Sequence, residues 1–280
     1  MTRAIGIDVG GTKIAAGLVD TATGALEARL ERGTRPERDP SEILADCVAM
    51  AQRLAAGQDG VAIGIGVCEL VDREGRTQSA QTIDWRETDI AGAFASVGPA
   101  TVESDVRAAA VAEARFGGGR GVDDLLFAIV GTGISCCLVL NGRAYAGARG
   151  NAICFGAPPV EDTSSGLALA AAGRRERAEE VLADPSLDDV VEAAAAALGG
   201  GLAWLVNALD PGLVVIGGGL GLADRYRELA AAAMRPLIFA HNSRAVPVVP
   251  AELGADAGVI GAALAARADR AGRPGIPHML

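Results

Sequence analysis

Hydrophobic residues near the start of the chain form two short runs, residues 4–9 and 13–20, with two glycines between them. Runs of this length on either side of a glycine turn are typical of a β-hairpin. Gly10 and Gly11 can adopt backbone angles that other residues avoid, so the chain could approach an anion closely and donate hydrogen bonds from the turn amides and the Thr12 hydroxyl. Alternatively, the two glycines only close the hairpin.

A second hairpin pattern begins at Leu125. Its apolar run is followed by Gly131, Thr132 and Gly133, and a further apolar run continues to Gly142. Two strand-turn-strand units about 120 residues apart indicate a duplicated fold. Each turn is therefore a candidate phosphate-binding loop.

Extended and helical patterns alternate through the rest of the chain, which makes α/β the expected fold class. The predicted strands are residues 25–32, 61–67, 100–103 and 213–216, and the predicted helices are residues 40–56, 106–116, 164–182, 186–208 and 256–268. Ser186 and Asp189 are placed to form a capping box at the start of the long helix. The glycine cluster 117–121 predicts a domain boundary.

The composition limits what kind of protein this is. With 280 residues, 50% of them hydrophobic, the chain can form two domains with a sizeable core. Its formal net charge of -10 argues against binding nucleic acid or an anionic membrane, so any phosphate has to be held locally. The first residues lead directly into a strand instead of a signal peptide, and the apolar segment 193–206 is shorter than the ~20 residues that span a bilayer. We therefore expect a cytoplasmic protein in which that segment is a buried helix.

Carboxylates are the side chains in this sequence on which we expect catalysis to depend. Histidine occurs only at His241 and His278, which argues against a Ser-His-Asp triad or a multi-histidine metal site. The five cysteines show no Cys-x-x-Cys spacing, and a cytosolic compartment would keep them reduced. The only lysine, Lys13, stands beside the first turn. Asp8, just before this turn, is placed to orient a metal ion beside bound phosphates.

Five motifs, in order along nearly the whole chain, resemble those of the ROK family of sugar kinases, within the superfamily of sugar kinases, heat-shock chaperone ATPases and actin. The first two are Asp8-x-Gly10-Gly11-Thr12-Lys13, and Glu103-Ser104-Asp105 followed by Ala108-Ala109-Ala110 and Glu113. The other three are Gly131-Thr132-Gly133-Ile134, Asn207-x-x-Asp210-Pro211 before Val214-Val215-Ile216-Gly217-Gly218-Gly219, and Asp256-Ala257-Gly258-x-Ile260-Gly261-Ala262. The resemblance implies a two-lobed actin-like or ribonuclease H-like ATPase fold with duplicated β-hairpin phosphate loops.

The resemblance also implies where ligands bind. One lobe would comprise residues 1–116, completed by the C-terminal helix 256–270, and the other residues 117–255, with ATP and substrate in the cleft between them. The phosphates would lie at two turns, formed by Gly10, Gly11, Thr12 and Lys13 and by Gly131, Thr132 and Gly133. Gly217 and Gly218 would flank the adenosine, and Asp8 would position Mg²⁺ through water. A homodimer is also implied.

Asp105 is the carboxylate that the resemblance assigns to catalysis. It would accept the proton of the attacking hydroxyl, since phosphoryl transfer otherwise needs mainly positioning and charge neutralisation. Because Asp105 precedes an alanine-rich helix, it could instead, or in addition, cap that helix.

The chain departs from the family pattern around the sugar. Ser104 stands where family members commonly have Asn, and Ile153-Cys154-Phe155-Gly156-Ala157 stands where a Gly-Glu-x-Gly-His segment usually follows Asn151. Cys154 and Ala157 thus occupy the carboxylate and imidazole positions. The family's cysteine-rich zinc loop is absent, so no structural zinc is expected, and Glu161 aligns with a later sugar-binding Glu.

Glu69 is a further departure, because Cys68-Glu69 stands where the family usually has Pro-Gly. With Glu161, it could pair with an ammonium group on the substrate. Alternatively, Glu69 is a solvated loop residue. The candidate substrate ligands are Glu69, Ser104, Asp105, Asn151 and Glu161.

The sequence therefore predicts an ATP-dependent kinase acting on a primary hydroxyl. Because hydroxyl-reading groups are missing, we expect an amino sugar such as kanosamine, or a cyclitol of antibiotic biosynthesis, in place of plain glucose. One alternative is a glucokinase-like hexose kinase. Another is a catalytically degenerate sugar-binding or regulatory ROK protein, although the family's repressors carry an N-terminal helix-turn-helix whereas this acidic chain begins at the hairpin strand.

Overall fold

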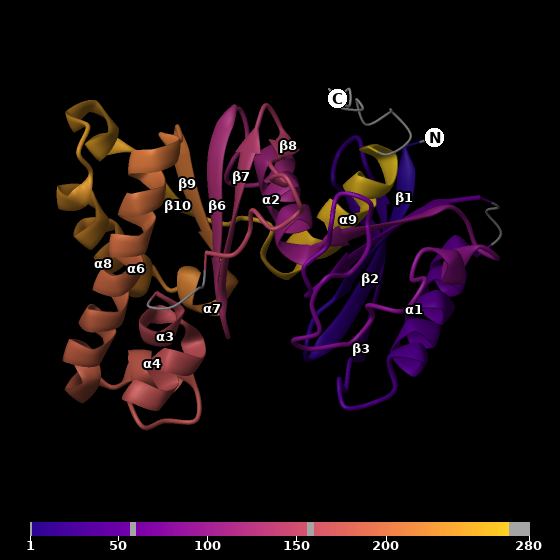
Figure 1. Cartoon of the computed structure of the whole chain (residues 1–280), viewed down its shortest axis with the longest axis horizontal. Helices are drawn as coiled ribbons and strands as arrows, with labels where there is room; N and C mark the ends of the chain where they lie inside the picture. Colours follow the sequence, from indigo (N-terminus) through magenta and orange to yellow (C-terminus); the bar gives the residue numbers. More distant parts are fainter. Residues whose placement is uncertain (1, 57–59, 156–159, 269–280) are drawn as a thin grey trace. The chain divides into compact units, whose positions relative to one another are not determined.

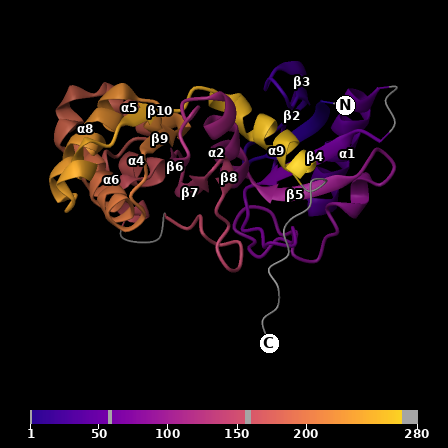
Figure 2. The same ribbon diagram turned by 90° about the horizontal axis from the view of Figure 1, so that it is seen from above.

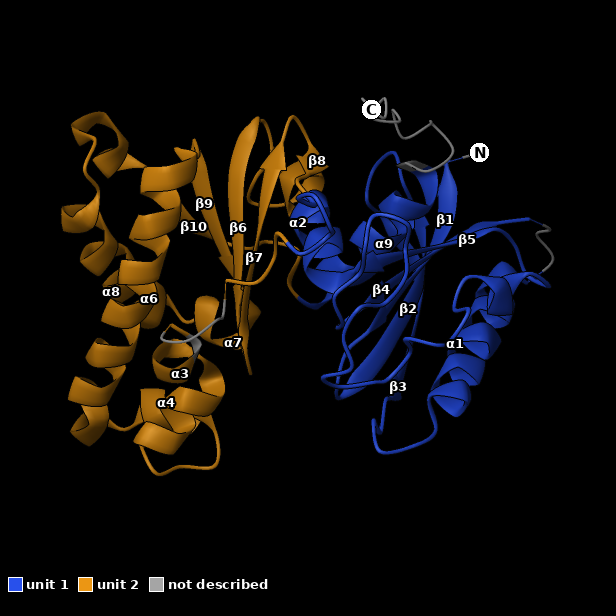
Figure 3. Ribbon diagram, viewed as in Figure 1, with its two compact units in different colours: residues 1–112, 146–151, 255–280 blue, residues 113–145, 152–254 orange. Residues whose placement is uncertain are grey.

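The computed structural model describes residues 2–56, 60–155 and 160–268, and the chain forms two compact units. Unit 1 comprises residues 1–112, 146–151 and 255–280, and unit 2 comprises residues 113–145 and 152–254 (Figure 3). The chain therefore passes between the units at 112/113, 145/146, 151/152 and 254/255. Nothing in the hydrophobic pattern predicts the short excursion 146–151 into unit 1.

Unit 1 is built on a five-stranded sheet with the order β3-β2-β1-β4-β5 (Figure 1). Its strands are β1 (Arg3–Val9), β2 (Lys13–Asp20), β3 (Leu26–Gly33), β4 (Ala62–Val67) and β5 (Ala100–Ser104). β1 and β2 form the predicted antiparallel hairpin, whereas β4 and β5 run parallel to β1. Every residue of β4 is buried, as expected for a strand covered on both faces.

Side chains of β1 alternate between the two faces of this sheet, and a helix covers each face. On one face, Ile7 belongs to a hydrophobic core that includes the buried side chains of α1 (Pro40–Ala55). On the other face lies α9 (Ala257–Ala268), so close that a Cβ on Gly6 or Gly64 would overlap its backbone (Figure 2). Glycine at these strand positions therefore sets the short distance between the C-terminal helix and the sheet.

Unit 2 repeats this architecture, since its sheet has the order β10-β9-β6-β7-β8. Its strands are β6 (Asp124–Val130), β7 (Ile134–Leu140), β8 (Arg143–Ala144), β9 (Leu213–Gly217) and β10 (Val248–Pro250). β6 and β7 form the second predicted hairpin, and β9 is parallel to β6 as β4 is parallel to β1. The predicted α/β class and the duplicated hairpin are thereby confirmed.

One predicted helix of unit 2 is broken into shorter helices. Residues 164–182 were expected to be helical, but the structure has α3 (Glu161–Ser164), α4 (Gly166–Ala172) and α5 (Ala178–Ala183). Arg174, between α4 and α5, has a φ of 54°. A left-handed residue of this kind is typical of a helix end, so the helical pattern is interrupted there.

The predicted capping box of Ser186 with Asp189 is wrong. Oδ1 of Asp184 accepts hydrogen bonds from the N and Oγ of Ser186, at 3.0 and 2.6 Å. Asp184 thereby caps a short 3₁₀ turn, Pro185–Leu187, from which the long helix continues. The proline at the first position of this turn has a backbone angle suited to starting a helix.

The long core helix of unit 2 is α6 (Asp188–Leu209), which packs against α8 (Asp224–Met234) (Figure 1). Among the described residues, α6 with its preceding turn is the one helix long and apolar enough to cross a bilayer, but half of its most apolar window is buried in the protein. The predicted buried helix is thus confirmed for one face of α6. On the opposite face, Trp204 is 81% exposed.

The first passage between the units lies inside α2 (Asp105–Phe116). In its last turns, Glu113 is fully buried. The Glu113 carboxylate accepts hydrogen bonds from three backbone N–H groups, those of Gly118 at 3.0 Å, Glu252 at 3.0 Å and Leu253 at 2.8 Å. One buried carboxylate therefore ties the chain that follows α2 to the chain that leads into α9.

Candidate active site

Four carboxylates lie at the same edge of the unit 1 sheet. Asp8 of β1 pairs in register with Gly66 of β4, and Gly66 pairs with Glu103 of β5. These strands are parallel, so the residues at or just beyond their carboxyl ends share one edge, where ligands bind in open α/β sheets. Asp8, Glu69, Glu103 and Asp105 are the acids found there.

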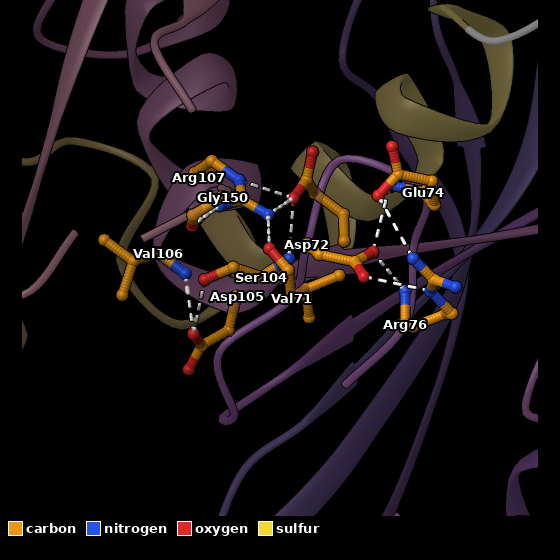
Figure 4. A network of polar contacts seen from close by, with 10 residues as sticks. Val71, Asp72, Glu74, Arg76, Ser104, Asp105, Val106, Arg107 and Gly150 are labelled. Atoms are coloured by element: carbon orange, nitrogen blue, oxygen red, sulfur yellow. Dashed lines mark hydrogen bonds and ion pairs between the residues drawn. The ribbon is translucent and has the colours of Figure 1, made fainter. Parts of the chain in front are cut away.

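Asp105 is the first residue of α2, directly after β5. Its Oδ1 accepts hydrogen bonds from Val106 N at 2.7 Å and from Ser104 Oγ at 3.4 Å (Figure 4). Burial and the nearby charge of Asp8 raise the pKa of Asp105 to about 7. The bond to Val106 satisfies an amide of the first helical turn, and a pKa near neutrality suits a general base, so the two predicted roles of Asp105 are compatible.

Asp8 faces the start of α9. A Cβ added to Gly258 would overlap the Asp8 carboxylate, and one added to Gly66 would lie 3.7 Å from Asp8 Oδ1 and 3.5 Å from Asp105 Cα. Burial raises the pKa of Asp8 to about 6, against the opposing effect of the Lys13 charge. Neighbouring acids with raised pKa values are typical of sites that bind cations or move protons.

A buried threonine braces the first hairpin turn. Gly10 N donates to Lys13 O at 3.0 Å and closes the turn. Thr34, which is fully buried, donates from its Oγ1 to Gly10 O at 2.6 Å and from its N to Thr12 O at 3.0 Å. Nothing in the sequence singled out Thr34, because it lies beyond β3 in a loop with no motif of its own.

Gly10 and Gly11 can adopt backbone angles that other residues avoid, but neither uses them here, since neither has a positive φ. Their small size matters instead. A Cβ on Gly11 would lie 3.2 Å from Thr82 Cγ2, and at Gly131 no described atom beyond its chain neighbours lies within 4 Å of such a Cβ. Glycine therefore keeps open the space beside both turns.

Thr12 and Lys13 are exposed at the first turn. The Lys13 ammonium lies 3.5 Å from Glu31 Oε2, and both side chains are close to half exposed. Such a surface ion pair contributes little, so Lys13 can exchange this partner for a phosphate at small cost.

Glu69 has a role that the sequence did not predict. The solvated-loop alternative is wrong, because the residue is only 3% exposed. Its carboxylate accepts hydrogen bonds from Ser79 Oγ and from the N–H groups of Gln81 at 2.9 Å, Thr82 at 2.6 Å and Ile83 at 2.9 Å. Four donors leave this carboxylate little capacity for a substrate ammonium. Glu69 instead orders the loop 79–83, which places Thr82 beside Gly11.

The remaining candidates of unit 1 are Ser104, which precedes Asp105 in the chain, and Asn151, whose neighbour Gly150 contacts the helix that Asp105 begins. Ser104 is fully buried, and its hydroxyl helps to orient the Asp105 carboxylate by donating to it. Asn151 is exposed at the end of the excursion 146–151. The carbonyl of its neighbour Gly150 accepts a hydrogen bond from Arg107 Nη1, on the first turn of α2 (Figure 4). Arg107 was not singled out from the sequence.

The candidates of unit 2 lie at the ends of two adjacent parallel strands. Gly131, Thr132 and Gly133 form the turn after β6, whereas Gly217 ends β9 and Gly218 begins α7 (Gly218–Gly221). Gly131 N donates to Gly133 O at 2.9 Å and closes the turn. Gly218 has a φ of 82°, and a Cβ there would overlap the Val130 backbone, so only glycine fits between the two strand ends.

Two candidates around the predicted sugar segment fall outside the described residues, namely the side chain of Glu161 and the position of Ala157 within 156–159. Cys154, just before that segment, is an exposed free thiol. In the described ranges, no group of three or more His, Cys, Asp or Glu side chains could hold a metal ion.

Known proteins resemble the chain over both units. The sequence model of the ROK family matches residues 4–187 and 160–269. A glucokinase from Streptomyces coelicolor is 32% identical, covering 95% of this chain and 98% of that protein. An N-acetylmannosamine kinase from Yersinia pseudotuberculosis is 29% identical, with coverage of 96% and 99%. A ROK family glucokinase from Streptomyces griseus, crystallised with glucose and AMPPNP, has a TM-score of 0.79 at 28% identity, with coverage of 95% and 99%.

Proposed function

The chain belongs to the ROK family, and we propose that it is an ATP-dependent kinase that phosphorylates a primary hydroxyl of an amino sugar, such as kanosamine, or of a cyclitol of antibiotic biosynthesis. Its relatives are named sugar kinases, so the activity class is phosphoryl transfer from ATP to an alcohol group. The observation that carries the proposal is Asp105, whose pKa of about 7 and position beside Asp8 suit it to accept the proton of a hydroxyl.

Each candidate residue has a role in this reaction. Asp105 would take the proton of the attacking hydroxyl as its oxygen bonds to the γ-phosphorus and ADP leaves. Carboxylate oxygen is a ligand type that Mg²⁺ prefers, so Asp8 would hold, through water, the Mg²⁺ that neutralises the phosphate charge. The turns at Gly10 to Lys13 and Gly131 to Gly133 would hold the phosphates, and Gly217 and Gly218 would flank the adenosine.

The choice of substrate depends on polar groups that this chain lacks. Cys154 and Ala157 stand at the carboxylate and imidazole positions of the family pattern, so the hydroxyls of glucose would lose two partners. Glu69 does not support an ammonium-bearing substrate, because the loop 79–83 occupies its carboxylate. Glu161 remains as the acidic partner for an amino group. The Yersinia relative is named for an N-acetylated amino sugar.

Acceptor specificity tests the proposal directly. We expect ADP release from Mg-ATP with kanosamine, glucosamine or a seven-carbon cyclitol at a kcat/KM at least roughly tenfold above that for glucose. The panel should also include mannose and N-acetylhexosamines. Glucose as the best acceptor would instead support a glucokinase-like hexose kinase. ATP binding without turnover on any acceptor would contradict the kinase assignment.

We also propose that two copies associate through the exposed apolar surface of unit 2 around Trp204 and Phe239, which are 81% and 92% exposed. Asn207 lies one turn after Trp204 on α6 and connects this helix to the segment that carries Phe239. Its Nδ2 donates to Leu237 O at 3.1 Å, and its Oδ1 accepts from Phe239 N at 2.8 Å. Light scattering should give the mass of two 28.2-kDa chains. Trp204→Glu should give one chain with unchanged secondary structure, and a wild-type monomer would contradict the proposal.

A further inference from the structure

Arg107 is a buried charge to which the proposed reaction gives no role. It lies two residues after Asp105, and only 2% of it is exposed. Its Nε donates to Glu103 Oε1 at 2.6 Å, its Nη2 to Val71 O at 2.8 Å, and its Nη1 to Gly150 O (Figure 4). A buried guanidinium is costly unless its donors are paired. Here one guanidinium joins three separate segments of the chain.

One of these segments is the excursion 146–151, termed the strap. It has no helix or strand of its own and ends at the candidate ligand Asn151. Gly150 has a φ of 86°, and a Cβ there would overlap Val71 O and lie 2.7 Å from Asp72 Cα. The strap thus touches the 71–72 backbone directly, and Arg107 donates to one carbonyl on each side of this contact.

The other side of the contact is held firmly. Asp72 Oδ1 accepts hydrogen bonds from Glu74 N at 3.0 Å and Arg76 N at 2.9 Å, and its Oδ2 pairs with Arg76 Nε at 3.0 Å (Figure 4). Val71 also forms a β-bridge with Thr77. This braced turn gives the strap a fixed surface, and Arg107 is the side chain that couples that surface to α2.

We propose that Arg107 is a positioning residue for the acceptor sugar: it fixes the strap, and with it Asn151, relative to the start of α2 that carries Asp105. The inference rests on the proposed function, because it takes Asn151 as a sugar ligand and Asp105 as the base. Without Arg107, two carbonyls at the contact lose a charged donor and the strap moves. Sugar binding is then impaired, whereas the phosphate turns stay intact.

The test compares Arg107→Met, which keeps the aliphatic stem, with Arg107→Lys and Gly150→Ala. Arg107→Met should raise the sugar KM roughly 10- to 100-fold and leave the ATP KM unchanged. Gly150→Ala, which displaces the strap and leaves the Arg107 side chain unsubstituted, should give the same selective rise, and Arg107→Lys should restore part of the affinity. Arg115→Met, an exposed arginine on the same helix, is the matched control.

Hydrogen exchange gives a readout that does not depend on turnover. In Arg107→Met, amides of the strap should exchange faster while those of β1 and β2 do not. An unchanged sugar KM with unchanged strap exchange would overturn the proposal and leave the kinase assignment standing, and equal losses in both KM values with faster exchange throughout would also overturn it. If the wild type phosphorylates no acceptor, the proposed function fails, and selective exchange of the strap would still support its fixation by Arg107.

Discussion

Replacement of Asp105 by asparagine is expected to lower kcat for sugar phosphorylation by roughly 10²- to 10⁴-fold. Asparagine has the same shape and can still accept the hydrogen bonds from Val106 N and Ser104 Oγ, so the start of α2 is preserved. Its amide cannot take up the proton of the attacking hydroxyl. Initial rates of ADP release measure the effect, with KM for ATP as the internal control, because the phosphate turns are untouched.

The pH dependence of the wild type belongs to the same prediction. Burial raises the pKa of Asp105 from its ordinary value of 3.8 to about 7, and only the ionised form is a base. The value of kcat/KM should therefore rise with pH up to about 7 and level off above it. The stability of the fold depends on pH in the opposite direction. Because the folded state holds this proton more tightly than the unfolded state, the free energy of unfolding falls as pH rises from 3.8 to about 7. Near-normal activity in Asp105→Asn, or residual activity that keeps the same acid limb, would contradict the assignment.

Local periodicity predicted most of the fold because the strands and their turns are local features. β4 is buried on both faces and bounded by loops, so its apolar run located it to within one residue. The errors have tertiary causes. Arg174 adopts a left-handed conformation within a helical composition, and Asp184 caps the chain where Ser186 was expected to. The strap is six residues without periodicity, so no pattern signals that it belongs to unit 1.

The residues of the candidate site also fall into two groups, those that the sequence indicated and those whose roles depend on distant parts of the chain. Asp8 and Asp105 stand at strand ends. The place of Asp8 before a glycine turn suggested a metal-orienting role, whereas the role of Asp105 as a base came from the family resemblance. The roles of Thr34, Glu69 and Arg107 depend on partners 24, up to 14 and 43 residues away in the chain. Glu69 was expected to face the substrate or solvent because its partner loop, 79–83, has no recognisable motif. The role of a buried charge can be predicted from sequence only when its partners can be predicted too. The partners of Glu69 and Arg107 are mainly backbone groups, which carry no sequence signal.

Asp8→Asn is expected to lower kcat/KM by roughly 10²- to 10³-fold, the usual loss when one preorganised electrostatic group is removed from a reacting centre. The substitution keeps the size of the side chain, so its contact with Gly258 at the start of α9 is retained. It removes a negative charge that raises the pKa of Asp105. The acid limb of the pH profile should therefore move to lower pH, even though the rate at its plateau falls. Glu27→Gln, which removes an exposed charge elsewhere in unit 1, should change neither quantity.

Titration with Mg²⁺ separates the two ways in which Asp8 can act. If Asp8 holds the ion, Asp8→Asn should need a higher Mg²⁺ concentration for half-maximal rate, because an amide oxygen binds a hard cation less strongly than a carboxylate does. If Asp8 acts only through its charge, the acid limb moves and the Mg²⁺ dependence does not. A variant that keeps wild-type kcat/KM and the wild-type limb would show that Asp8 serves only to fill the space between β1 and α9. The pH profile and the Mg²⁺ titration together therefore show whether the Asp8 carboxylate binds the metal, raises the pKa of Asp105 or only packs between β1 and α9.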